Sequence, residues 1–83
     1  MTPHRCKAQI IADILITCQG TGASKTYIIR QVNLNLKTVD PYLDLLTKRG
    51  ILEVIQKEFV IYKTTANGEQ VLKSFMAISE IFS

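Results

Sequence analysis

Residues 35–50, with the sequence NLKTVDPYLDLLTKRG, carry the pattern of a helix whose two ends are both marked. Asn35 is a residue type that caps helix N-termini, because its side-chain oxygen accepts a backbone N–H of the first turn. The other end has a cationic last turn and then Gly50, which tolerates the left-handed conformation that ends a helix. Between these ends, four apolar residues recur at three- and four-residue steps and are predicted to face the core: Leu36, Val39, Leu43 and Leu46.

Two short strands and a last helix are predicted after this segment. Residues 52–56 and 59–63 are rich in β-branched and aromatic side chains, and only Lys57 and Glu58 separate them clearly. This spacing is typical of a hairpin with a tight polar turn. Thr65 is then expected to cap a helix over residues 66–82.

Two further helices are predicted before residue 35. A helical pattern covers residues 4–18, and Gly20 and Gly22 follow it as terminators. Ser24 is expected to cap a second, short helix, which Asn33 ends. The apolar residues of the first helix fall on one face: Ile10, Ile11, Ile14, Leu15 and Cys18.

The predicted order is three helices, a hairpin and a final helix, which is typical of a winged helix-turn-helix. The fold class is therefore predicted as mainly α (α+β), with the hairpin as the wing; a generic small α+β domain is the alternative. Residues 1–65 are assigned to the winged helix and residues 66–83 to a C-terminal dimerisation helix. Both belong to one domain, because 83 residues leave no room for a second.

Several stretches resemble a known family. Residues 38–52 are similar to the recognition-helix-to-strand signature of winged-helix regulators, the superfamily of arsenic- and multidrug-resistance repressors. Residues 62–68 resemble the family's junction between second strand and last helix. Within that superfamily, the chain most resembles small archaeal winged-helix DNA-binding proteins, which dimerise through a C-terminal coiled-coil helix. Residues 10–15, 22–26 and 33–36 add to this likeness, which implies a DNA-binding homodimer.

In the winged-helix geometry the third helix lies in the DNA major groove and the wing touches the adjacent backbone. Lysine side chains can meet phosphates, Asn35 can bond an adenine edge, and Thr38 can meet a phosphate or a thymine methyl group. A lysine or threonine at a helix N-terminus is a common phosphate clamp, although each of these residues could instead be an ordinary solvated side chain. The predicted DNA contacts are Lys25, Thr26, Asn35, Lys37, Thr38, Lys57 and Lys63.

Asp40 and Pro41 depart from what a DNA-reading helix needs. A proline inside a helix removes a backbone hydrogen bond at a cost of about 3 kcal/mol, unless the helix bends or starts later. Asp40 and Asp44 also place negative charges where phosphates approach. We predict a bend between Lys37 and Tyr42, in preference to a helix that begins at Asp40, and little base-specific reading.

Homodimerisation is expected through the C-terminal helix. Eight of the thirteen residues from Val71 onward are apolar, which is more than one side of a helix needs to cover its own domain. The spacing suits knobs-into-holes packing of two helices, and the resemblance implies an antiparallel pair. The residues predicted at the interface are Val71, Leu72, Phe75, Met76, Ile78 and Phe82.

Composition narrows the class of function. Two cysteines and one histidine are too few for a common zinc site, and no cofactor or membrane segment is indicated. Residues 20–26 superficially resemble a phosphate-binding loop but lack its glycine spacing and its preceding strand. We find no catalytic set and predict a cytoplasmic protein that is not an enzyme.

Two functions remain open at this stage. The net charge of +3 mildly favours duplex DNA as partner, for a transcriptional regulator or a chromatin-associated protein. The alternative is a winged-helix protein–protein interaction module. Residues 1–34 hold four basic and one acidic side chain, whereas residues 35–63 hold five and four, so the basic excess does not gather on the presumed reading helix.

Overall fold

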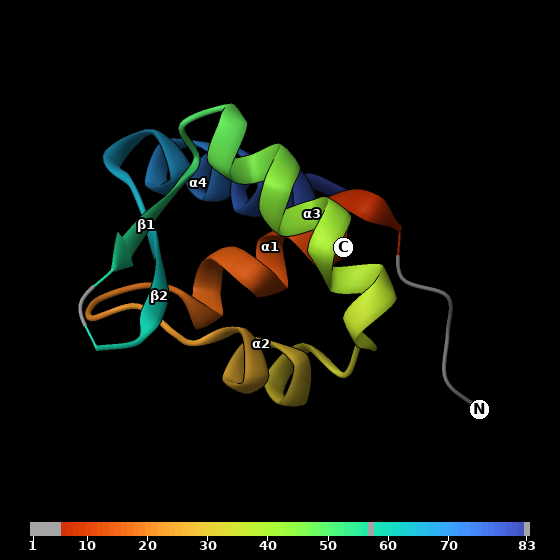
Figure 1. The fold of residues 1–83 in the computed structure, drawn as a ribbon. Helices are drawn as coiled ribbons and strands as arrows, with labels where there is room; N and C mark the ends of the chain where they lie inside the picture. Colours follow the sequence, from red (N-terminus) through yellow and green to blue (C-terminus); the bar gives the residue numbers. More distant parts are fainter. Residues whose placement is uncertain (1–5, 57, 83) are drawn as a thin grey trace.

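The computed structural model describes residues 6–56 and 58–82 and shows the predicted order of elements (Figure 1). Three helices, a two-stranded antiparallel sheet and a fourth helix form a mainly helical fold, as expected for a winged helix. The bounds are α1 (Lys7–Thr17), α2 (Lys25–Val32), α3 (Leu36–Lys48), β1 (Leu52–Gln56), β2 (Val60–Thr64) and α4 (Ala66–Phe82).

The predicted caps hold the helix ends. Ser24 accepts a hydrogen bond from the backbone N–H of Tyr27 at the start of α2, over 3.2 Å. Asn33 ends α2 in the left-handed conformation, with φ 59°. Thr65 accepts from the backbone N–H of Gly68 at the start of α4, and its hydroxyl also donates to the carbonyl of Gly50 over 2.6 Å. The loop after α3 is thereby tied to the beginning of α4.

The core lies between α1, α2, α3 and the first half of α4. The apolar stripe of α3 faces inward as predicted at Val39, Leu43 and Leu46. The prediction was wrong for Leu36, which is 53% exposed, because the first residue of α3 lies beyond the edge of the core. The largest fully buried side chains are Ile14, Leu15, Ile28, Leu43, Leu46, Leu52, Val32, Val39 and Cys18.

The first strand covers Leu52–Gln56 as predicted, whereas the second is shifted by one residue. The second strand covers Val60–Thr64 instead of residues 59–63, and Leu52 pairs with Thr64. Two bonds hold the end of this strand against the end of α1: Thr64 donates its hydroxyl to the carbonyl of Leu15 and its N–H to the carbonyl of Cys18. The first helix is also shorter than predicted: it begins at Lys7, while residues 4 and 5 lie outside the described chain.

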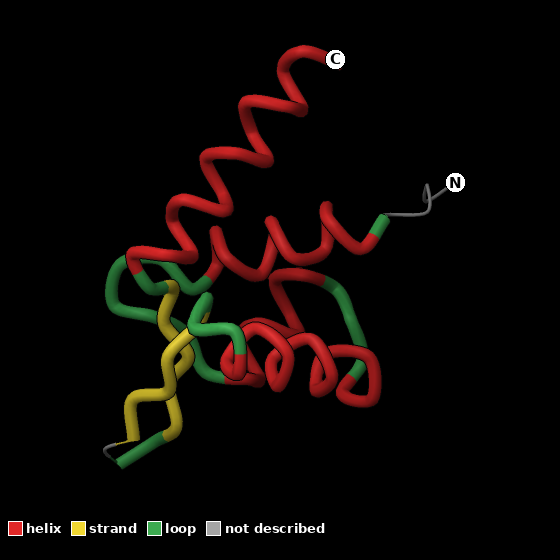
Figure 2. The backbone as a smooth tube through the Cα atoms, turned by 90° about the horizontal axis from the view of Figure 1, so that it is seen from above, coloured by secondary structure: helices red, strands yellow, loops and turns green. Residues whose placement is uncertain are grey.

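The hairpin and the last helix project from opposite parts of the helical body (Figure 2). The far end of the hairpin extends past the helices, and the second half of α4 runs beyond α1. These two projections are therefore the parts of the fold best placed to reach a partner.

Candidate nucleic-acid interface

The helix-turn-helix places α3 with one side in the core and the other free. Val39, Leu43 and Leu46 fill the inner side, while Lys37 and Asp44 are exposed on the outer side. This outer side carries both signs of charge. It can meet phosphates through its lysines, but as a whole it does not form a basic surface.

Lys25 is bound to α3 by an ion pair that links two of the predicted elements. Its ammonium nitrogen lies 2.6 Å from a carboxylate oxygen of Asp40, and both side chains are partly exposed. The pKa of Lys25 is raised, chiefly because Asp40 accepts this hydrogen bond, with smaller contributions from Tyr62 and Asp44. The start of α2 and the middle of α3 are therefore joined at one ammonium group.

Asn35 and Thr38 are joined to each other. The side-chain oxygen of Asn35 accepts from the backbone N–H of Thr38 over 2.8 Å and from its hydroxyl over 2.9 Å. Asn35 is thus the cap of α3, and its side-chain oxygen already accepts two hydrogen bonds from Thr38. Thr38 lines a groove of about 370 Å³ beside α1, together with Lys7, Pro41, Tyr42 and Leu45.

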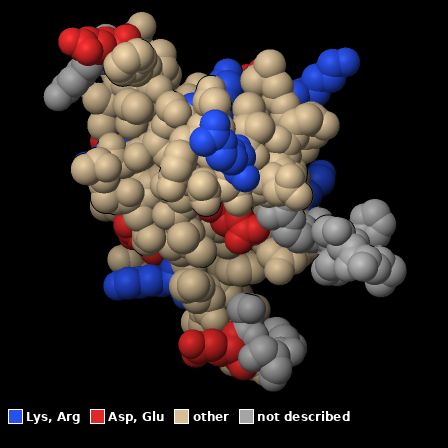
Figure 3. Space-filling view, turned by 90° about the horizontal axis from the view of Figure 1, so that it is seen from below, with Lys and Arg blue, Asp and Glu red and all other residues tan. Residues whose placement is uncertain are grey.

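The other predicted contacts are spread over the surface. Thr26 and Lys37 are exposed on α2 and α3, and Lys63 is half-buried on β2. Lys57 lies outside the described residues. Figure 3 shows one face of the molecule, on which Lys and Arg side chains stand apart on mostly uncharged surface. On this face the described Lys and Arg side chains do not form one continuous patch.

The sequence analysis missed the roles of two residues in this region. Asp40 was interpreted only as an obstacle to phosphates, not as the partner of Lys25. Arg30 is exposed in the last turn of α2 and adds a cation that the prediction omitted. The available signal for Arg30 was its position off the apolar stripe of α2.

Of the α4 side chains predicted at the dimer interface, some pack into the core and others are exposed. Leu72 is only 4% exposed and belongs to the core of its own domain, and Phe75 packs against that core. Leu72 therefore cannot supply a free surface. Val71, Ile78 and Ile81 are exposed and, with Ser74, follow the 3–4–3 spacing of one helix face. Met76 is exposed on another side, and the side chain of Phe82 is not among those described.

The described residues offer few groups for other kinds of site. No three His, Cys, Asp or Glu side chains come together there in a way that could hold a metal ion. None of the helices in residues 6–56 and 58–82 is both long and apolar enough to span a bilayer. Cys6 and Cys18 are both free thiols.

The fold and the arrangement of α2, α3 and the hairpin define a class of protein. The chain belongs to the winged helix-turn-helix family, whose model matches residues 4–83.

A solved structure is similar over nearly the whole chain. It is the crystal structure of Sso10a-2, a DNA-binding protein from Sulfolobus solfataricus, with a TM-score of 0.83 and 26% sequence identity. The likeness covers 93% of this chain and 81% of that chain. No curated protein matches the chain by sequence.

Proposed function

We propose that this protein binds duplex DNA as a homodimer, mainly through phosphate contacts, as a transcriptional regulator or a chromatin-associated protein. The observation that carries the proposal is the likeness of the whole domain to a DNA-binding protein, together with lysines on α2, α3 and the wing. Phosphate contacts set affinity without reading sequence, which agrees with the mixed charge of α3.

A second function has its own support. Asp40 and Asp44 lie on the surface of α3 that would face DNA, and Asp40 forms an ion pair with Lys25. An outer surface with both signs of charge also suits a protein partner. A winged-helix interaction module without DNA binding is therefore the alternative.

Titration with duplex DNA at several salt concentrations separates the two. If a dimer neutralises roughly 4–8 phosphates, log affinity falls with log salt with a slope of about −4 to −7. Lys37→Glu is expected to weaken binding to all duplexes alike. Lys73→Glu changes the charge equally on α4 and is the matched control, expected to leave binding nearly unchanged. Absence of binding at low salt would favour the interaction module.

A further inference from the structure

The tip of the hairpin presents a large aromatic side chain to solvent. Phe59 is 72% exposed and lies in the turn between the two strands, a position that polar residues usually fill. Exposed single apolar residues are common on proteins, but this one stands at the end of the element that projects farthest from the body on its side (Figure 2). In this position the ring is free to contact a partner.

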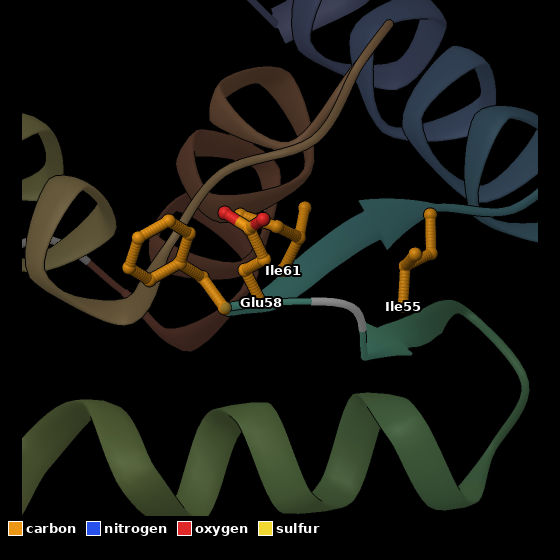
Figure 4. A pocket seen from close by; sticks show the side chains of 4 residues that line it. Ile55, Glu58 and Ile61 are labelled. Carbon is orange, nitrogen blue, oxygen red and sulfur yellow. The ribbon is translucent and has the colours of Figure 1, made fainter.

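Phe59 also has apolar neighbours on the hairpin. Ile55 and Ile61 are cross-strand partners, so their side chains share one face of the sheet. With Glu58 and Phe59 they line an open groove of about 370 Å³. Figure 4 shows Ile55, Glu58 and Ile61 on the side of the hairpin that faces away from α3. The tip is therefore an apolar projection with a hollow behind it.

The described charges of the wing are of both signs. Glu53 pairs with Lys63 across the strands, so the one described lysine of the hairpin has an acidic neighbour. Glu58 lies beside Phe59 and lines the same groove. Beside the phosphate contacts predicted for its lysines, the described part of the wing therefore offers an apolar contact.

The position of the hairpin limits what that contact is. β1 packs beside the end of α3, so a duplex with α3 in its major groove brings the neighbouring minor groove to the wing. Apolar side chains that enter a minor groove part the stacked bases and bend the duplex toward the major groove. An exposed phenylalanine on a narrow hairpin has the shape for this insertion.

We propose that Phe59 is a wedge that enters the DNA minor groove and opens one base step. The proposal rests on the proposed function, since it assumes that α3 is seated on DNA. Pyrimidine–purine steps such as TA open most easily, so the wedge gives the protein a preference for flexible steps without any hydrogen bond to a base. The mixed charges on α3 would not by themselves give a preference for flexible base steps.

A duplex with 2-aminopurine at a central TA step tests the wedge, because the fluorescence of this base rises when it is unstacked. Wild-type protein is expected to raise the fluorescence, Phe59→Leu to preserve most of the rise, and Phe59→Ser to abolish it. Phe59→Ser is also expected to weaken binding to this duplex by roughly tenfold, with an unchanged salt slope. Val60→Thr, an exposed neighbour in the same hairpin, is the control and should behave as wild type.

The possible failures are distinguishable. If wild-type protein does not bind duplex DNA at any salt concentration, the proposed function fails and the wedge fails with it. If wild-type protein binds with the expected salt slope but Phe59→Ser leaves the fluorescence and the affinity unchanged, only the wedge is wrong. Thermal unfolding of each variant confirms that the substitutions leave the domain folded.

Discussion

The ammonium group of Lys25 and the carboxylate of Asp40 lie 2.6 Å apart and join the start of α2 to the middle of α3. A DNA phosphate would need the same ammonium group. Because the carboxylate already accepts one of its hydrogen bonds and neutralises its charge, Asp40 competes with a DNA phosphate for Lys25. The ion pair thus opposes the contact that the fold otherwise favours.

Asp40→Asn is expected to strengthen DNA binding by roughly 3- to 10-fold at low salt, because it frees Lys25 and removes a negative charge. The salt dependence should become steeper. Stability should change by less than about 1 kcal/mol, since the pair is exposed to solvent. Fluorescence anisotropy with a labelled duplex and thermal unfolding measure the two effects.

Glu69→Gln is the matched control for that experiment. It changes the net charge by the same amount on α4, where Glu69 accepts a hydrogen bond from Gln19. Equal gains in affinity for the two variants would show that only net charge matters and that the ion pair does not restrain Lys25.

Pro41 lies inside α3, which begins at Leu36. The alternative of a helix that starts at Asp40 is therefore wrong, whereas the predicted bend stays a prediction. Proline has no N–H to offer the carbonyl of Lys37, four residues earlier. Pro41→Ala restores this bond at an exposed position and is expected to stabilise the domain by about 1–2 kcal/mol. Chemical denaturation checks it, and an unchanged or lowered stability would contradict the expectation.

The two cysteines are expected to differ in reactivity. Cys18 is buried, and burial raises its pKa from 9.0 to about 12, whereas Cys6 is exposed. Because the thiolate is the reactive form, an alkylating reagent at about pH 8 should modify one thiol in the folded protein and two after unfolding. Mass spectrometry counts them, and two modifications of the folded chain would contradict the burial of Cys18.

The same pKa implies a pH dependence of stability. In the folded state Cys18 keeps its proton where the unfolded chain loses it, so this thiol favours unfolding as the pH rises from 9.0 toward about 12. Below that window it has no influence on stability. Cys18→Ala should remove this part of the alkaline loss of stability in denaturation curves recorded at several pH values.

Local signals predicted most of the fold, and packing decided the remainder. Caps act on the next three residues, so Ser24 and Asn35 could be recognised from sequence alone. The Lys25–Asp40 pair joins residues fifteen positions apart on two helices, and only their crossing brings these side chains together. For the same reason the second strand was predicted one residue too early, because its end depends on the bond of Thr64 to Leu15 in a distant helix.

The exposed face of α4 leads to the last prediction. Val71, Ile78 and Ile81 lie on one side of the helix, and Ile81 is 76% exposed. Val71 also lines a groove of about 220 Å³ whose other walls come from α1, α3 and the loop after α3. A second copy that packs its own α4 along this face would cover both, as the proposed homodimer requires.

Light scattering at micromolar concentration should give twice the 9.3 kDa of one chain. The double change Ile78→Glu and Ile81→Glu should give the single-chain mass, because two carboxylates per helix cannot be buried in an apolar seam. Lys73→Glu alters the net charge by the same amount on another side of α4 and should stay dimeric. Circular dichroism shows whether each variant is folded, since Leu72 and not these residues holds α4 to its own core. A wild-type protein of single-chain mass, or a folded double variant that stays dimeric, would rule out this face as the interface.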